Sequence, residues 1–99
     1  MAVYIIGAIE IHDQELYRQY SELARIAMAD FDMECVSADD NPVVYEGNQP
    51  ANHLMIFKFR SKEDYEAFVA SPAYQKALPL RKAGSTTSFI MAMQPPGGA

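Results

Sequence analysis

Segment 61–81 constrains the fold more than any other part of the chain, because it predicts two consecutive helices with a fixed break between them. Ser61 is a favourable N-cap, and Asp64 follows three residues later in an acidic variant of the capping box. Ser71-Pro72 ends this first helix, and a short second helix starts at Ala73, since proline suits the first helical turn. The apolar face of the first helix consists of Tyr65, Phe68 and Val69.

The remaining chain predicts strands on either side of one more helix. A helix is expected over about 15–30, because its apolar residues follow helical spacing and Asp13 is a good N-cap. The turn residues at 39–42 separate two short strands and indicate a β-hairpin. The predicted strands are 3–11, 31–36, 43–46, 53–59 and 85–93.

With the hairpin counted as one unit, this order is βαββαβ, the ferredoxin-like arrangement. We therefore predict an α+β fold with an extra β-hairpin and a short helix before the last strand. Strands 3–11, 53–59 and 85–93 are apolar on both faces, so the sheet face that the helices leave uncovered must be buried by something else. We expect a second copy of the chain to cover it, which gives a homodimer.

Length and composition indicate one globular domain. The chain has 99 residues, 49% of them hydrophobic, and we expect a domain over 1–94 and a flexible tail over 95–99. The net charge of −5 argues against a nucleic-acid partner. We predict no signal peptide and no membrane span. Cys35 is the only cysteine and is interpreted as a buried structural thiol, which favours a reducing, cytoplasmic setting.

Charge is distributed unevenly along the chain. Residues 26–57 contain six acids and no Lys or Arg, whereas 58–94 contain six bases and three acids. One interpretation is a solvated face. The other is a pair of complementary patches that help two subunits dock.

Several motifs resemble the domain-of-unknown-function 1330 family of the dimeric α+β barrel superfamily. The resemblance covers 2–93, and its most specific part is the run 71–75, Ser-Pro-Ala-Tyr-Gln, followed by Arg81. Weaker parts of the resemblance are Tyr4, Asp13, Tyr17, Tyr20, Glu46-Gly47 and Phe59-Arg60-Ser61.

The resemblance implies a ferredoxin-like subunit and a homodimer, but no settled activity. Relatives in the wider superfamily include cofactor-free monooxygenases and lactone isomerases, which use pockets beside the sheet. The chain departs from the family pattern at 30–32 and 38–40, where the family carries glycines, and at His53, where it tends to carry arginine. The hairpin and the His53 position are therefore the least transferable parts.

His53 and Arg81 are the candidate catalytic residues. A histidine titrates near neutrality and can move a proton, and His53 begins a strand next to a loop. The competing interpretation is an edge histidine with one hydrogen bond. An arginine can clamp a carboxylate or enolate with two donors. The competing interpretation of Arg81 is a surface ion pair, with Glu46 or with an acid of the helix after Ser61.

Tyr17, Tyr20, Tyr74 and Met55 are the candidate substrate-binding residues. Their phenol groups and thioether are natural lining for a cleft between helices and sheet. Packing is the competing role, most strongly for Tyr20, which lies on the core stripe of its helix, and for Tyr74, an anchor of the short helix.

We expect neither a metal nor a cofactor. Glu10, His12 and His53 lack metal-binding spacing, and the chain carries no phosphate loop, nucleophile elbow or dinucleotide fingerprint. The predicted function is binding of a small, oxygenated organic molecule in an apolar cleft, by a cofactor-independent enzyme of isomerase, lactone-acting or monooxygenase type that uses His53 and Arg81. The alternative is a non-catalytic ligand-binding or structural dimer.

Overall fold

The computed structural model describes residues 2–98, so Met1 of the predicted domain and Ala99 of the predicted tail lie outside the described residues. Four strands and three helices follow in the order expected for a ferredoxin-like fold, and a short 3₁₀ turn lies at Pro96–Gly98. The elements are β1 Val3–Ile11, α1 Gln14–Met28, β2 Met33–Asp39, β3 His53–Phe59, α2 Lys62–Ala70, α3 Pro72–Gly84 and β4 Ser85–Met93.

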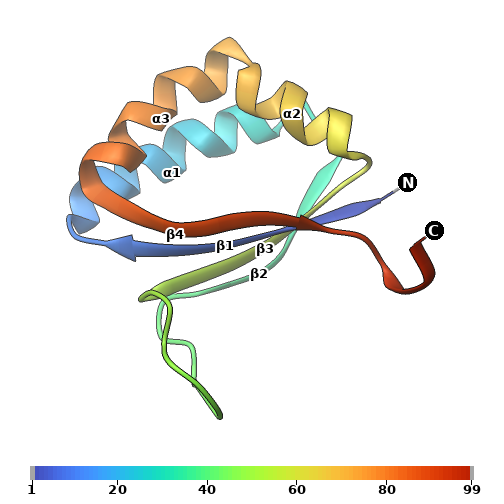
Figure 1. Cartoon of the computed structure of the whole chain (residues 1–99). Coiled ribbons are helices and arrows are strands. Elements are labelled where there is room, and N and C mark those ends of the chain that lie inside the picture. The colour runs from blue at the N-terminus through green and yellow to red at the C-terminus, as the bar shows by residue number, and fades with distance from the viewer. Residues whose placement is uncertain (1, 99) are drawn as a thin grey trace.

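The four strands form one antiparallel sheet in the order β2-β3-β1-β4. The helices all cover the same face of this sheet, as Figure 1 shows. The predicted α+β, ferredoxin-like fold is confirmed. In the β1–β3 ladder Ile9 pairs with His53 and Gly7 with Met55, which sets the floor of the cleft described below.

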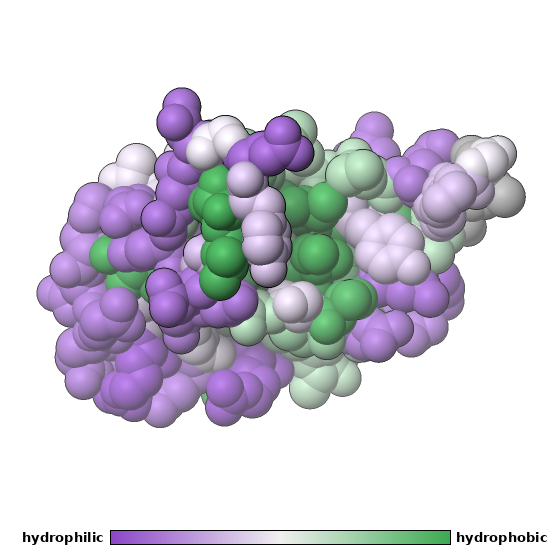
Figure 2. Space-filling model, turned by 90° about the horizontal axis from the view of Figure 1, so that it is seen from below, coloured by the Kyte–Doolittle hydropathy of each residue, from purple (hydrophilic) through white to green (hydrophobic). Residues whose placement is uncertain are grey.

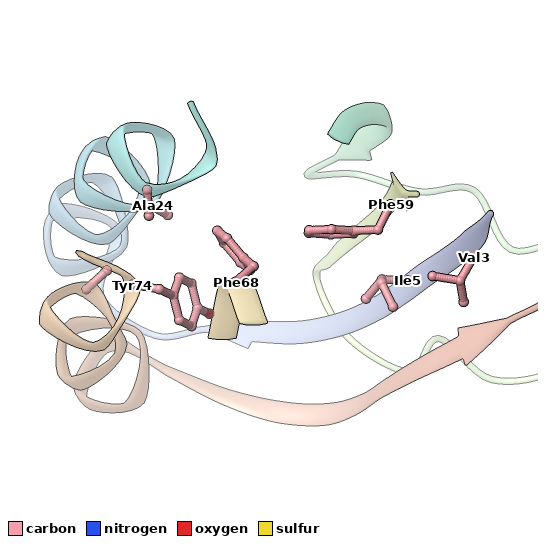
Figure 3. Packing of buried hydrophobic residues seen from close by; sticks show 8 residues of the cluster. Val3, Ile5, Ala24, Phe59, Phe68 and Tyr74 are labelled. Carbon is pink, nitrogen blue, oxygen red and sulfur yellow. The ribbon is translucent and has the colours of Figure 1, made fainter. Parts of the chain in front are cut away.

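The core lies between the helices and the sheet (Figure 3). Phe68 of α2 is its centre, with ring centroids 5.5 Å from Phe59 of β3 and 4.6 Å from Tyr74 of α3. Phe59, Phe68 and Tyr74 are all buried, and such aromatic contacts add to the free energy gained by burying apolar area. The core residues of this cluster are Val3, Ile5, Ala24, Ala27, Phe59, Phe68, Tyr74 and Ala77.

The helix starts expected from the sequence are confirmed by their caps. The carboxylate of Asp13 accepts a hydrogen bond from Leu16 N at 3.0 Å, and Ser61 Oγ accepts one from Asp64 N at 3.1 Å. Ser71 Oγ accepts from the Tyr74 backbone N at 3.2 Å, so a single serine ends α2 and begins α3. Each cap satisfies a backbone N–H that the first helical turn leaves free.

The second helix of segment 61–81 is longer than expected. The prediction of a short helix is wrong, because α3 continues through Pro79 to Gly84 and exceeds α2 in length. Packing of α3 on α1 outweighs the hydrogen bond that Pro79 cannot donate. Gly84 permits this close packing, since a Cβ there would lie 2.9 Å from Leu16 Cβ.

The predicted strand 43–46, and with it the extra β-hairpin, is also wrong. Residues 40–52 form an irregular loop that projects from the sheet (Figure 1), and β2 pairs with β3 instead. Apolar composition suggested a strand, but Val43 is 73% and Tyr45 91% exposed. Asn52 anchors the end of the loop on β1 by accepting a hydrogen bond from Ile11 N at 2.8 Å and donating one to Ile11 O at 3.0 Å.

None of the described helices covers the sheet face opposite α1, α2 and α3 (Figure 1). Ile6 of β1 pairs with Ile56 of β3 on one side and with Met91 of β4 on the other. Figure 2 shows the resulting hydrophobic area at the centre of this face, flanked by polar residues. We call this surface the open face; its residues include Tyr4, Ile6, Leu54, Ile56, Phe89, Met91 and Met93.

Candidate functional site

A cleft between the helices and the sheet has two compartments. The outer groove, of about 310 Å³, opens between α1 and the strands β2 and β3 and is lined by residues that include Tyr17, Arg25, Cys35 and His53. The inner cavity, of about 40 Å³, lies beneath the helices and is lined by residues that include Ile5, Gly7, Tyr74 and Arg81. Four residues belong to both linings: Tyr20, Met28, Met55 and Phe57.

His53 lies at the outer end of the cleft, at the start of β3. Its side chain is only 12% exposed, and its Nδ1 lies 2.6 Å from Asp40 Oδ1. The ring also packs edge-on against Tyr17, with 5.5 Å between centroids. An Nδ1–H that donates to a carboxylate fixes the tautomer and leaves Nε2 free to accept a proton.

Asp40 is a candidate site residue that sequence reasoning missed. Asp39 pairs with Leu54, so the next residue of the chain, Asp40, lies beside His53. The predicted hairpin of 31–36 with 43–46 concealed this neighbour, because it paired β2 with the wrong segment. Asp40 itself is 83% exposed, so its contribution is orientation of the imidazole more than stability.

The three predicted tyrosines form a continuous row from His53 to the inner cavity. Ring centroids are 5.2 Å apart between Tyr17 and Tyr20 and 6.0 Å apart between Tyr20 and Tyr74. The hydroxyl oxygens of Tyr20 and Tyr74 are 2.8 Å apart, so one donates to the other. The sequence indicated each tyrosine as a candidate but did not predict the hydrogen bond between the hydroxyls of Tyr20 and Tyr74.

Burial keeps these phenols protonated. Desolvation raises the pKa of Tyr17 to about 12, although the positive charge of Arg81 acts in the opposite direction. Desolvation, and then the proximity of Tyr74, raise the pKa of Tyr20 well above its ordinary value. At neutral pH both groups are hydrogen-bond donors.

Arg81 lies in the last turn of α3 and contributes to the inner cavity. Its Nη1 donates to Thr87 Oγ1 at 2.8 Å. Its Nε is buried and has no hydrogen-bond partner among the described residues, and no ion pair of Arg81 is found within 2–98. The surface ion pair considered from the sequence is therefore not formed in the described chain, and the cation faces the cleft instead.

Met55 lies on the floor of the cleft, directly over Gly7. A Cβ built on Gly7 would lie 3.2 Å from Met55 Cγ and 3.3 Å from Met55 Cε. The missing side chain at residue 7 thus provides the space that Met55 fills. A glycine weakens a central strand, and the close contact with Met55 explains why residue 7 is a glycine.

The prediction that Cys35 is buried is wrong. The thiol predicted to be buried is exposed, because β2 is the edge strand of the sheet and the helices do not cover it. Cys35 lines the outer groove. Within residues 2–98 no three His, Cys, Asp or Glu side chains gather in a metal-binding arrangement.

Two wider hollows, of about 390 Å³ each, lie elsewhere on the surface. One is formed around Lys58 and Arg60, and the other around Ser61 and Gln94. Four of the seven residues that line each hollow are charged or polar. The helix–sheet cleft is the better candidate because it combines apolar walls with a few converging polar groups.

Comparison with known proteins identifies a family and a fold. The family model described as Domain of unknown function (DUF1330) matches residues 2–94. A search of curated proteins found no match. No described helix is both long and apolar enough to cross a membrane.

Three solved structures illustrate the similarity of fold. The protein of unknown function RPA0582 from Rhodopseudomonas palustris is 15% identical, with a TM-score of 0.83 over 95% of this chain and 82% of that one. SnoaB, a cofactor-independent oxygenase from Streptomyces nogalater, is 12% identical, with a TM-score of 0.69 over 95% and 92%. HapK from Hahella chejuensis is 13% identical, with a TM-score of 0.65 over 98% and 95%.

Proposed function

We propose, from the premise that the chain belongs to the family described as Domain of unknown function (DUF1330), that its helix–sheet cleft binds a small oxygenated organic molecule and transfers a proton on it without a cofactor. The observation that carries this proposal is the Asp40–His53 pair, whose 2.6 Å contact orients an imidazole at the mouth of an apolar groove. SnoaB, which has a similar fold, is a cofactor-independent oxygenase and makes such chemistry a reasonable starting point.

The proposed reaction begins with proton removal. His53 Nε2 takes a proton from a carbon next to a carbonyl or from a phenol, and the electron pair of that bond moves onto oxygen as an enolate or phenolate. Arg81 stabilises the negative charge that develops on the oxygen. Return of the proton from His53 to a different carbon gives an isomer, so that atoms and electrons balance without an oxidant.

Asp40 acts as a positioning residue in this scheme. It accepts the hydrogen bond from Nδ1 and stabilises the imidazolium that forms after proton removal. Tyr17 also packs against the ring, through the edge-on contact at 5.5 Å. The imidazole therefore has two neighbours, and the hydrogen bond to Asp40 uses Nδ1 and not Nε2.

A deuterium-exchange experiment tests the proposal. 2-Tetralone has a planar apolar body and an acidic C–H next to its ketone, and incorporation of deuterium from D₂O is followed by NMR. The wild-type protein is expected to exceed the buffer rate, and His53→Gln to reduce the excess by roughly 100-fold or more. Asp40→Asn is expected to reduce it by about 10-fold.

His12→Gln is the matched control, because His12 is exposed and its side chain bonds only Thr86 among the described residues. Its exchange rate should equal that of the wild type. Exchange that is unchanged in His53→Gln would contradict the assignment of the base. Binding of the ketone without any exchange would favour the alternative function, a non-catalytic ligand-binding dimer.

The proposed assembly is a homodimer formed through the open face. Ile56, Ile6 and Met91 form a row at the centre of this face, and Met91 is 53% exposed. Covering such an apolar surface with a second sheet lowers the free energy of the assembly. The two-fold arrangement lets the same patch serve both subunits.

Sedimentation tests this assembly. The wild type is expected at twice the monomer mass at micromolar concentration, and Ile56→Glu at the monomer mass. Lys76→Glu, on the exposed surface of α3, should remain dimeric. A monomeric wild type would refute the dimer while leaving the proposed chemistry of the cleft to its own test.

A further inference from the structure

Arg81 has a buried N–H donor, Nε, for which the described chain provides no acceptor. Nη1 bonds Thr87, but Nε has neither an acceptor nor contact with solvent. A guanidinium N–H left unpaired in an apolar environment costs several times the free energy of an ordinary hydrogen bond. A native structure that tolerates such a group is expected to use it on a ligand.

The inner cavity offers N–H and O–H donors but no carboxylate or amide acceptor. Apart from Arg81 its lining is apolar or aromatic and contains no Asp, Glu, Asn or Gln. The Tyr20 and Tyr74 hydroxyls bond each other at 2.8 Å, which uses one of their two hydrogens and leaves the other for an incoming acceptor. A positive charge with free N–H and O–H groups favours an anionic oxygen.

The size of each compartment limits what each can hold. About 40 Å³ accommodates one small polar group, since a single water needs roughly 10–15 Å³ of such space. A ring does not fit there. The outer groove, at about 310 Å³, has room for a flat apolar body of one or two rings.

Met28 and Met55 stand between the two compartments, because both line the cavity and the groove. Methionine side chains are flexible and make favourable contacts with aromatic rings. The Met55 side chain rests on Gly7 and makes no hydrogen bond to the described residues, so that displacing this side chain breaks van der Waals contacts alone. These two side chains can therefore move apart when a ligand enters and then pack against its two faces.

We infer that the ligand is a planar, mostly apolar molecule with an acidic oxygen group at one end, which enters past His53, lies between Met28 and Met55, and sets its anionic oxygen on Arg81 Nε. The acidic group is a carboxylate, phenolate or enolate, whose shared chemistry is a negatively charged oxygen acceptor. This inference rests on the proposed function only in using the same cleft, since it requires binding and no reaction.

Two isosteric probes test it, 2-naphthoate and the neutral 2-naphthamide, with affinities measured by calorimetry. The wild type is expected to prefer naphthoate by about 10- to 100-fold, the usual gain of a charge-assisted contact. Arg81→Met should abolish that preference while retaining the affinity for naphthamide.

Arg18→Met is the matched control, because Arg18 is an exposed arginine of α1 that pairs with Glu15 and Glu22 and lines neither compartment of the cleft. It should keep the preference for naphthoate. Should Arg81→Met fail to fold, Arg81→Lys retains the charge without Nε and is expected to lower the preference at least about 3-fold.

The outcomes separate this inference from the proposed function. Equal affinity of the wild type for both probes, or a preference that survives in Arg81→Met, would overturn the inference and leave proton transfer by His53 standing. Failure of both probes to bind would contradict the inference and the cleft itself. The preference for naphthoate should remain in His53→Gln even if this variant loses deuterium exchange.

Discussion

The hydroxyl pair of Tyr20 and Tyr74 gives the sharpest prediction about the inner cavity. The oxygens are 2.8 Å apart, and Tyr74 is only 6% exposed. Tyr20→Phe keeps the ring, which packs at 6.0 Å and 80° to that of Tyr74, and removes the hydroxyl alone. The surviving hydroxyl then loses its partner inside an apolar cavity.

The magnitude follows from that geometry. Loss of a net hydrogen bond costs about 1 kcal/mol, and an unsatisfied buried group raises the cost to between about 1 and 3 kcal/mol. We expect about 1–2 kcal/mol for Tyr20→Phe and for Tyr74→Phe, or a fall in Tm of roughly 5–10 °C each. The double variant leaves no unpaired hydroxyl, so its cost should be at least about 1 kcal/mol below the sum of the singles.

Urea denaturation of the four proteins at one fixed concentration measures this coupling, since association would shift apparent stability. Tyr45→Phe, at a side chain 91% exposed, is the control and should change the free energy of unfolding by less than about 0.5 kcal/mol. Costs that add within about 0.5 kcal/mol would refute the hydroxyl pair as a structural unit.

Three further changes are predicted. Because burial raises the pKa of Tyr17 in the fold to about 12, from 10.0, its stabilisation is complete below pH 10 and lost as pH rises toward 12. Urea unfolding at pH 9 and pH 11.5 should therefore differ by about 2 kcal/mol more in the wild type than in Tyr17→Phe, and an equal loss in both would contradict the raised pKa. Gly84→Ala should destabilise by about 1–3 kcal/mol, since its Cβ would lie 2.9 Å from Leu16 Cβ, and a Tm at or above that of the wild type would exclude this clash. Pro79→Ala, at an exposed position inside α3, should stabilise by about 1–2 kcal/mol by restoring a helical N–H, and a lower unfolding free energy would show that proline has a packing role there.

The architecture was predictable because it depends on local signals. Asp13, Ser61 and Ser71 are caps that act within three residues of themselves, β-branched composition located β1, and alternation of side chains located β3. The errors at 43–46 and at Pro79 arose where local preference and tertiary packing disagree. Val43 has strand propensity but no neighbouring strand, and α3 keeps its helix through a proline because α1 packs against it.

The residue types of the candidate site could be predicted from the sequence, but its geometry could not. His53, Arg81 and the three tyrosines could be nominated because their side chains carry titratable or donor groups. Asp40 could not be nominated, since its relation to His53 depends on the register of β2 against β3. The division of the cleft depends on Met55 resting on Gly7, a contact between strands that are 48 residues apart in sequence at this pair.

Methionine methyl resonances give the most direct test of the central claim that the cleft is the binding site. With ¹³C-methyl methionine and 2-naphthoate, we predict that Met28 and Met55, which line both compartments, shift on titration. Met91 and Met93 on the open face are internal controls and should not shift. Shifts confined to Met91 and Met93, or no shift at Met28 and Met55 at saturation, would contradict the cleft as the site.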